Sequence, residues 1–417
     1  MIAIDFGTTN SSLAVFAEGD TEPRIQKLEY GDPDSLDPNV MPSAISECKS
    51  HECRVSAITL GNEALRHYFG TRHDISLLQE MKLHFDRTTK EPPTLVETGE
   101  VRRLREEGGF LSLERRMLRQ AIYEGDIPLE PRDFVPRAAM LIKGLVERAT
   151  RVEDRGEAIF GVPASFQEAG KKRLREAAKR ALVGDAGSYE RVHLYYEPVA
   201  AARAYKYLEA GNTLVLDYGG GTLDISVIAM EAGGRFDPAR VTYGGFSEGG
   251  SRMDQRILEY CLDKGGRRLS EWFSSQNILL RRRIKRNVEA AKIKLSLVPE
   301  ADVEFPGSEI GSISLTRPDL ALALQPIMTR MAVKIAQVVL DAVGKIENIN
   351  FVVLSGGSSL NRAVQDGVLS IFGHIPPDRF VLPDAAKPQE VETCLCAVAK
   401  GLAWLRKDGF PPIDFGD

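Results

Sequence analysis

The stretch Thr213–Ile228, TLVLDYGGGTLDISVI, decides the fold. Its opening residues form a short apolar run that favours a strand, and a second apolar run follows Asp224. The glycines between the runs predict a tight turn that approaches a ligand closely, because glycine has no Cβ. Successive N–H groups in such a turn converge on phosphate oxygens. The stretch therefore predicts a strand, a phosphate-binding turn and a returning strand.

The same pattern opens the chain, in IAIDFGTTNSSLAVF. Aligning the two stretches places Asp5 on Asp217, Phe6 on Tyr218 and Gly7 on Gly219. One such turn is weak evidence, because Asp and Gly are ordinary turn residues. Two copies half a chain apart predict a two-lobed molecule in which each lobe offers one hairpin to a shared cleft.

Asp5, Asp217 and Asp224 would surround that cleft. Two carboxylates ~5 Å apart repel by roughly 3 kcal/mol at an effective dielectric of ~20. A bound triphosphate adds negative charge, so the pattern favours a hard cation such as Mg²⁺. The alternative is that each Asp caps a turn; that fits a single Asp better than three in duplicated settings.

Phosphoryl transfer also needs a positive charge near the γ-phosphate and a group that orients the attacking water. Lys82, in EMKLHF, is a candidate for the first role, and Glu197, ahead of Pro198, for the second. The structural alternatives are a surface lysine and an ordinary helix N-terminal carboxylate. A third unit, Phe351–Leu354 followed by GGSS, suits a nucleoside or phosphate at a helix N-terminus.

Composition sets the class of protein. A chain of 417 residues allows two or more domains, and a net charge of −5 with pI ≈ 5.9 argues against a nucleic-acid-binding surface. The basic run RRRIKR at 281–286 is interpreted as the solvated face of a helix. We expect no signal peptide and no membrane span, and hence a cytoplasmic protein.

Other site patterns are weaker. The 5 cysteines are scattered, which suggests a reducing compartment. Cys48, His51 and Cys53 lack a fourth zinc ligand nearby. A GxSxG at Gly245–Gly249 resembles a hydrolase turn, although His374 is the only histidine after it; turn chemistry is the alternative. Walker-type and dinucleotide glycine motifs are absent from the sequence.

The apolar periodicity predicts the main elements. The alanines of EPVAAARAYKYL allow that helix to pack closely against a neighbour, and we expect the tail GFPPIDFGD to be loose. Helices are expected over Glu100–Glu124, Phe134–Thr150, Gln167–Leu182, Met253–Lys264, Ile278–Leu297, 318–344 and Val391–Leu405, and strands over Glu157–Val162, Arg191–Tyr196, Arg240–Gly245, 301–316 and Phe351–Leu354.

Six motifs carry a family resemblance: DFGTTNS, GVPASF, YEPVAAARAY, DYGGGTLD, EAAKIKLS and VLSGGSS. In this order and spacing they resemble the ATPase domain of the seventy-kilodalton heat-shock protein family, the DnaK-type chaperones, and most nearly its shortened YegD-type members. The resemblance implies an α/β, two-lobed, actin-like ATPase with duplicated ribonuclease-H-like βββαβα cores and a nucleotide cleft between the lobes.

The resemblance implies roles for individual residues. ATP or ADP would be bound with Mg²⁺, whose water shell Asp5 and Asp217 would hold, with K⁺ nearby. Lys82, Glu197, Asp224 and Thr222 would be catalytic, and Pro163 would relay the nucleotide state. The nucleotide-binding set would comprise Gly7, Thr8, Thr9, Asn10, Gly219, Gly220, Gly221, Thr222, Gly249, Gly250 and, around the adenosine, Glu289, Lys292, Ser296, Gly356, Gly357 and Ser358.

The expected organisation follows the same resemblance. Lobe I would have its core in 1–40, 134–211 and 379–417 and a peripheral subdomain in 41–133. Lobe II would have its core in 212–248 and 318–378 and a peripheral subdomain in 249–317. No peptide-binding domain is expected.

Three positions depart from the family pattern. Ile293 and Leu360 stand where the family places arginines against the adenine, which predicts weaker nucleotide binding or relaxed base choice. His193 stands where an arginine linked to J-domain partners is usual, so that partnership is not expected.

The expected function is slow, Mg-dependent ATP hydrolysis that drives a chaperone-like switch in a monomer or weak oligomer. We expect binding to nucleotide, with no nucleic-acid or membrane partner, and the sequence identifies no protein partner. The alternatives are a nucleotide-switched filament or scaffold protein and a small-molecule kinase.

Overall fold

The computed structural model describes residues 1–7, 10–17, 19–28, 39–43, 45–48, 58–61, 63–64, 75–78, 85, 134–149, 156–163, 166–183, 189, 191–205, 210–230, 236–246 and 248–415. Among these residues no helix is long and apolar enough to cross a bilayer. In chain order the elements are β1 (Ile2–Asp5), β2 (Asn10–Val15), β3 (Arg24–Ile25), β4 (Val40–Pro42), β5 (Ile45–Cys48), β6 (Ile58–Leu60), β7 (Ile75–Leu78), α5 (Phe134–Arg148), β8 (Glu157–Val162), α6 (Glu168–Leu182), β9 (Arg191–Tyr196), α7 (Glu197–Ala204), β10 (Gly211–Tyr218), β11 (Leu223–Met230), β12 (Phe236–Phe246), α8 (Gly250–Ser275), α9 (Ile278–Leu297), β13 (Glu300–Glu304), β14 (Ser312–Thr316), α10 (Arg317–Val343), η2 (Ile346–Asn348), β15 (Phe351–Ser355), η3 (Gly357–Leu360), α11 (Arg362–Ile371), η4 (Pro377–Arg379), β16 (Phe380–Val381) and α12 (Pro388–Lys407).

The first sheet is mixed, with strand order β3-β2-β1-β8-β9 and β4 paired to β2. β1 is antiparallel to β2 and parallel to β8, which is in turn parallel to β9. The parallel strand β8 is buried along almost its whole length. This burial explains why its sequence, EAIFGV, is a nearly continuous apolar run rather than an alternating one.

The second sheet repeats this arrangement with strand order β12-β11-β10-β15-β16. β10 is antiparallel to β11 and parallel to β15. The hairpin registers also correspond, because Asp5 faces Ser12 in the first hairpin and Asp217 faces Asp224 in the second. The duplication predicted from the two glycine turns is therefore confirmed at the level of individual residue pairs.

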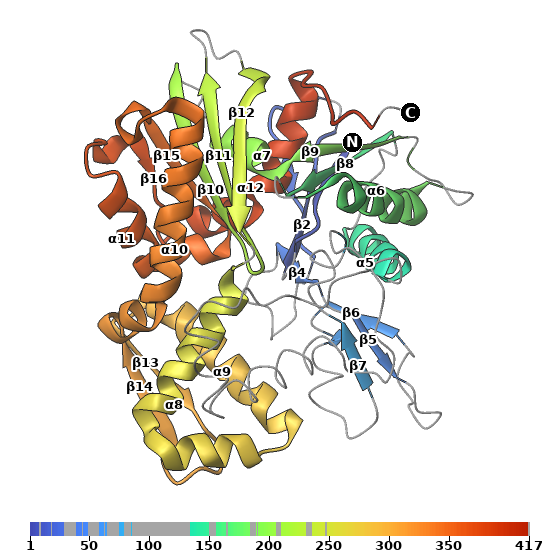
Figure 1. The fold of residues 1–417 in the computed structure, drawn as a ribbon. Coiled ribbons are helices and arrows are strands. Elements are labelled where there is room, and N and C mark those ends of the chain that lie inside the picture. The colour runs from blue at the N-terminus through green and yellow to red at the C-terminus, as the bar shows by residue number, and fades with distance from the viewer. Residues whose placement is uncertain are drawn as a thin grey trace.

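Two crossing helices, α7 and α12, join the sheets. They lie between the sheets in the upper half of Figure 1, and α12 contacts β1, β2 and β8 on one side and β15 and η3 on the other. The crossing is very close, since a Cβ on Gly401 would lie 1.7 Å from the carbonyl oxygen of Ala200. The alanines of α7 do allow the close packing that the sequence predicted.

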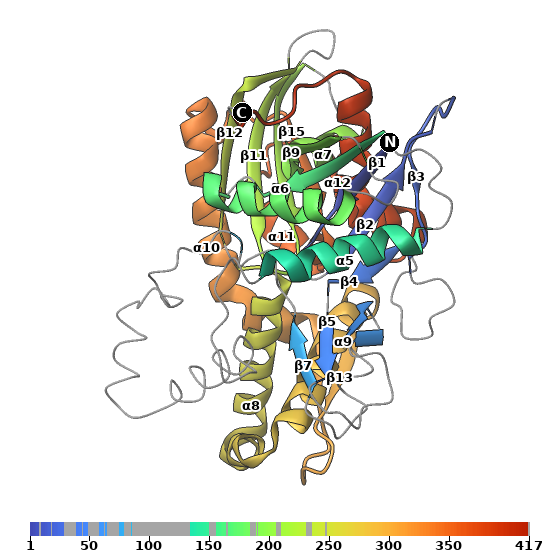
Figure 2. The ribbon, with the colours of Figure 1, turned by 90° about the vertical axis from the view of Figure 1, so that its right-hand side faces the viewer.

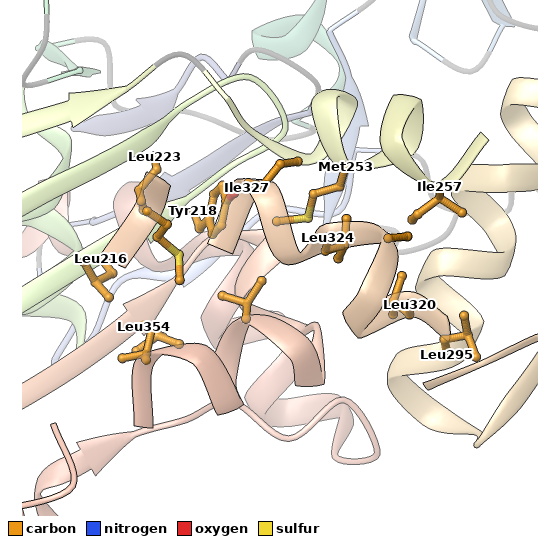
Figure 3. Close-up of a cluster of buried hydrophobic side chains, with 14 of the residues drawn as sticks. Leu216, Tyr218, Leu223, Met253, Ile257, Leu295, Leu320, Leu324, Ile327 and Leu354 are labelled. Carbon is orange, nitrogen blue, oxygen red and sulfur yellow. The ribbon is translucent and has the colours of Figure 1, made fainter. Parts of the chain in front are cut away.

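The outer faces of the sheets are covered by separate helices. α5 and α6 lie together beside the first sheet, and α10 runs along the second (Figure 2). Beneath α10, Leu216 and Leu354 of the second sheet share a core with Leu324 and Ile327 of α10 and Met253 of α8 (Figure 3). Each sheet thus buries one face under its own helices and the other against α7 and α12.

The lower half of Figure 1 holds smaller units. Below the second sheet lie α8, α9 and the β13–β14 hairpin, and below the first lies the small sheet β6-β5-β7. The basic run 281–286 belongs to α9, where Ile284 is buried while Arg283 and Arg286 are exposed. The run therefore lies on a helix, as predicted, with Arg283 and Arg286 exposed to solvent.

Most predicted elements are present, with two differences. The helix expected at Met253–Lys264 extends from Gly250 to Ser275, across a kink at Gly266 with φ 73. The prediction of a loose tail was wrong, because the Ile413 amide donates to Leu194 O at 2.9 Å and the Tyr195 hydroxyl donates to Phe410 O at 2.9 Å. The helix predicted at Glu100–Glu124 lies outside the described residues.

Candidate functional site

The predicted site residues lie at the carboxyl ends of the parallel strands. Asp5 ends β1, Pro163 follows β8, Glu197 follows β9, Asp217 is next to last in β10 and Gly356 follows β15. In open α/β sheets ligands bind beyond these strand ends. α12 also contacts β1 and β2 of the first hairpin and, in the second lobe, β15 and η3, which lie next to the second hairpin. The topology therefore assembles residues from both lobes at one end of the two sheets.

The first hairpin is described only in part. Asp5 is half-buried opposite Ser12, and Asn10 pairs with Pro42 of β4. A Cβ on Gly7 would lie 1.9 Å from the carbonyl oxygen of Asn10, so this turn requires glycine. Thr8, Thr9 and Lys82, three of the predicted site residues, lie outside the described residues.

The second hairpin is held against the strand that follows it in the sheet. The Gly219 amide donates to Thr222 O at 3.0 Å and closes the turn around Gly220 and Gly221. The Ser355 hydroxyl donates to Asp217 Oδ1 at 3.0 Å and so fixes that carboxylate. Gly356 has φ 82, and a Cβ there would lie 2.6 Å from the carbonyl oxygen of Tyr218. The glycine turn and the GGSS turn therefore touch, as a shared nucleotide site requires.

The first turn of α8 packs on the same glycine loop. Gly250 N donates to Gly219 O at 3.0 Å, and Ser251 N donates to Gly220 O at 2.8 Å. A Cβ on Gly249 would lie 2.5 Å from Gly220, so no larger residue fits there. The Ser358 hydroxyl donates to Gly219 O at 2.8 Å and ties η3 to the loop.

Three of the six predicted adenosine-binding residues lie on one face of α9. Glu289, Lys292 and Ser296 follow one another at helical spacing, and all are partly buried. Lys292 Nζ donates to Gly250 O at 3.3 Å and lies 2.7 Å from Asp254 Oδ1. Asp254 of α8 was not predicted; its one signal in the sequence is its place one helical turn after Gly250.

The two predicted catalytic carboxylates are buried, and one of them faces a predicted metal-shell carboxylate. Asp224 is 1% and Glu197 4% exposed, while Asp217, directly opposite Asp224, is half-buried. Facing carboxylates on neighbouring strands repel each other, so the pair favours a nearby cation. Glu197 occupies room left by Gly161, where a Cβ would lie 2.8 Å from Glu197 Cγ.

A hard cation fits these donors. Oxygen ligands are what Mg²⁺ prefers, and it commonly keeps most of its water and takes only one or two carboxylates. Among the described residues no group of three or more His, Cys, Asp or Glu could hold a metal ion alone.

The described residues give little support to the alternative site patterns, the hydrolase turn and the zinc site. Ser247 of the GxSxG turn, and His51 and Cys53 of the zinc pattern, lie outside the described residues. Cys261, Cys394 and Cys396 are buried, and none of the three forms a disulfide. Burial raises the pKa of Cys261 to about 12, so this thiol is protonated at neutral pH.

The three departures occupy different surroundings. Ile293 is 38% exposed on the face of α9 that carries Glu289 and Lys292, and Leu360 is half-buried at the end of η3. His193 Nε2 lies 3.4 Å from Glu157, which also pairs with Arg406. Burial lowers the pKa of His193, so the imidazole is neutral at neutral pH.

Comparison with known proteins agrees with this geometry. A family model described as Hsp70 protein matches residues 125–401. Chaperone protein DnaK of Cenarchaeum symbiosum (strain A) is 33% identical over 228 residues, which are 52% of this chain and 33% of the relative. Chaperone protein DnaK 1 of Synechococcus sp. is 30% identical over 62% of this chain and 35% of the relative. Chaperone protein DnaK of Thermus thermophilus is 32% identical over 59% of this chain and 41% of the relative.

These matches cover well under half the length of each curated relative, between 33% and 41%. The family model, in contrast, covers more than half of this chain and spans β8, the second sheet and most of α12. The two mixed sheets are accordingly the lobes of an actin-like ATPase domain, and the chain belongs to the Hsp70 family.

Proposed function

We propose that the protein binds ATP with Mg²⁺ between its two hairpins and hydrolyses it slowly, as an Hsp70-type conformational switch. The observation that carries this proposal is the shared register of the hairpins. It gives Asp5 and Asp217 equivalent places at the carboxyl ends of β1 and β10. A metal-bound triphosphate could therefore be approached by a carboxylate and a glycine turn from each lobe.

The chain's own residues divide the work in this proposal. The amides of Gly220 and Gly221 hold phosphate oxygens, while the Gly219 amide closes the turn on Thr222 O, and Asp217, fixed by Ser355, orients water of the cation's shell. Bound Mg²⁺ would supply charge neutralisation on the phosphates. Glu197 orients the attacking water and the buried Asp224 accepts its proton, while Lys82 offsets charge on the γ-phosphate.

A switch needs an element that both lobes share. α7 and α12 provide it, because α12 contacts strands of both sheets and its Gly401 touches the α7 backbone. We propose that opening and closing of the lobes occurs as a small sliding at this crossing.

Within the family we place the chain nearest to the YegD-type proteins and propose a chaperone-like role. The proposed domain boundaries are those derived from the sequence.

The test of ATP binding is the change in melting temperature with saturating Mg-ATP. Ligand at a hundred times its Kd adds about 2.7 kcal/mol, which is a shift of several degrees. We expect Asp217→Asn to lose this shift and Asp302→Asn, an exposed position on β13, to keep it. A full shift in Asp217→Asn would refute the proposed site.

Two further assays separate the alternatives. Nucleotide-dependent pelleting would favour a filament or scaffold protein. ATP consumption that requires an added sugar or acid would favour a small-molecule kinase.

A further inference from the structure

An ion pair joins α8 to α9 beside the candidate nucleoside site. Lys292 Nζ lies 2.7 Å from Asp254 Oδ1, and the two side chains are only 12% and 20% exposed. The same ammonium donates to Gly250 O at 3.3 Å. A lysine has a flexible four-carbon stem, so two acceptors on one helix restrict where its charge lies.

Gly250 connects this pair to the glycine loop. A Cβ at Gly250 would lie 2.9 Å from Ser358 Oγ, 3.4 Å from Lys292 Nζ and 3.5 Å from the Cα of Gly220. The Lys292 ammonium, the η3 hydroxyl and the phosphate-binding loop therefore meet around one residue. A displacement of Lys292 would therefore change the packing at the point where the nucleoside and phosphate parts of the site join.

We propose that Asp254 is a positioning residue that holds Lys292 against the first turn of α8, so that nucleoside affinity falls when Asp254 takes up a proton. This inference rests on the proposed nucleotide-binding function and specifies how that site responds to pH.

The surroundings of Asp254 set the pH range. Burial raises the pKa of the Asp254 carboxyl to about 6 and nearby Glu289 contributes to the rise, while Lys292 and Lys285 of α9 oppose it. α10 and β14 also pack on α8. The charged group that α10 brings to α8 is Asp319, which contacts Tyr260 and Lys264 near the middle of α8. The carboxylate is therefore charged at pH 7.5 and largely neutral at pH 5.

The first measurement is the affinity for ADP with Mg²⁺ between pH 5 and 8. We expect Asp254→Asn to bind about tenfold more weakly than the wild type at pH 8 and equally at pH 5, as for the loss of one charged hydrogen bond. Protonation of the ADP phosphates affects both proteins alike, so it cancels in the ratio of the variant's affinity to the wild-type affinity. Asp263→Asn, an exposed position on the same helix, is the matched control and should follow the wild type.

The second measurement needs no nucleotide. Acetylation of lysines by acetic anhydride, followed by peptide mass analysis, should modify Lys292 several-fold faster in Asp254→Asn, with exposed Lys294 as the internal reference. Equal Lys292 reactivity in variant and wild type would overturn the positioning role, whatever happens to affinity.

The outcomes separate the two proposals. ADP binding with a pH-independent ratio between Asp254→Asn and wild type would overturn this inference and leave the proposed function standing. Absence of ADP binding by the wild type at every pH would overturn the proposed function, and the pH-dependent affinity with it. The double variant Asp254→Asn/Lys292→Met removes both charges and so provides a further check. Folding stability that returns to the wild-type value while the ADP affinity stays low would support the positioning role. A return of both stability and ADP affinity to the wild-type values would refute it.

Discussion

The crossing of α7 and α12 gives the sharpest stability prediction. Replacing Gly401 with alanine places a methyl carbon 1.7 Å from Ala200 O and 2.4 Å from Ala200 C. Both obstacles are backbone atoms, so no side-chain rotation relieves the clash. The helices must part by about 1.5 Å, and a gap of half that size already forfeits a quarter or more of each dispersion contact across it.

The cost follows from what the crossing buries. Val199, Ala201, Val398 and Leu402 are buried in the cluster between the two sheets. Overpacking a well-filled core typically costs about 1–3 kcal/mol, and a backbone obstacle puts this case at the upper end. Alanine is a better helix former than glycine by about 1 kcal/mol, which offsets part of the cost. We expect Gly401→Ala to lose about 2 kcal/mol of unfolding free energy.

Gly367 of α11 is the matched control. A Cβ there meets only Met331 Cε at 3.5 Å and Met328 Sδ at 3.6 Å, which are ordinary contacts. Gly367→Ala should therefore gain about 0.5–1 kcal/mol from helix propensity alone. Urea unfolding followed by circular dichroism measures both, as opposite shifts of the midpoint. If Gly401→Ala were as stable as the wild type, α7 and α12 could not approach each other as closely as described.

Three further predictions test other parts of the molecule. Hydrogen bonds from the Tyr260 hydroxyl and from Thr316, with Lys264 nearby, hold the pKa of Asp319 well below its usual range. Asp319→Asn should therefore lower the free energy of unfolding by about 1–2 kcal/mol at pH 7. Urea midpoints of variant and wild type should show this difference becoming smaller as the pH falls below about 4. Ile293→Arg should strengthen ATP binding about two- to thirtyfold by cation–π stacking on adenine, and unchanged calorimetric affinity would remove Ile293 from the base site. Lys82→Ala should spare binding and slow single-turnover hydrolysis, and equal rates would exclude Lys82 from the mechanism.

The parts of the fold that sequence predicted are those specified locally. A glycine turn between two apolar runs defines a hairpin within about fifteen residues, so both hairpins and their correspondence could be derived without long-range information. The GGSS turn after β15 could be placed for the same reason, although a 3₁₀ segment, Gly357–Leu360, precedes its helix.

The parts that sequence missed depend on partners far away in the chain. The tail has no periodicity, yet the backbone of β9 gives it a hydrogen-bonding partner at Leu194. The alanines of α7 indicated close packing, but nothing local identified Gly401 as the partner. In the sequence Asp254 looks like any acidic residue on an amphipathic helix, because its partner Lys292 comes from a different helix, α9.

The duplicated hairpins also indicate which lobe carries the chemistry. Their registers correspond residue by residue, so Ser12 of the first hairpin occupies the place that Asp224 has in the second. Both side chains are 1% exposed, so the surroundings are similar and the difference lies in the functional group. A serine hydroxyl is not a base at neutral pH, whereas a carboxylate beside a cation can accept a proton from water. The two lobes can therefore share the binding of phosphate and metal, but proton removal in the proposed reaction belongs to the second lobe. Exchanging the groups, as Ser12→Asp with Asp224→Ser, should preserve Mg-ATP binding and abolish turnover. Retained turnover in that double variant would show that the lobes are chemically equivalent.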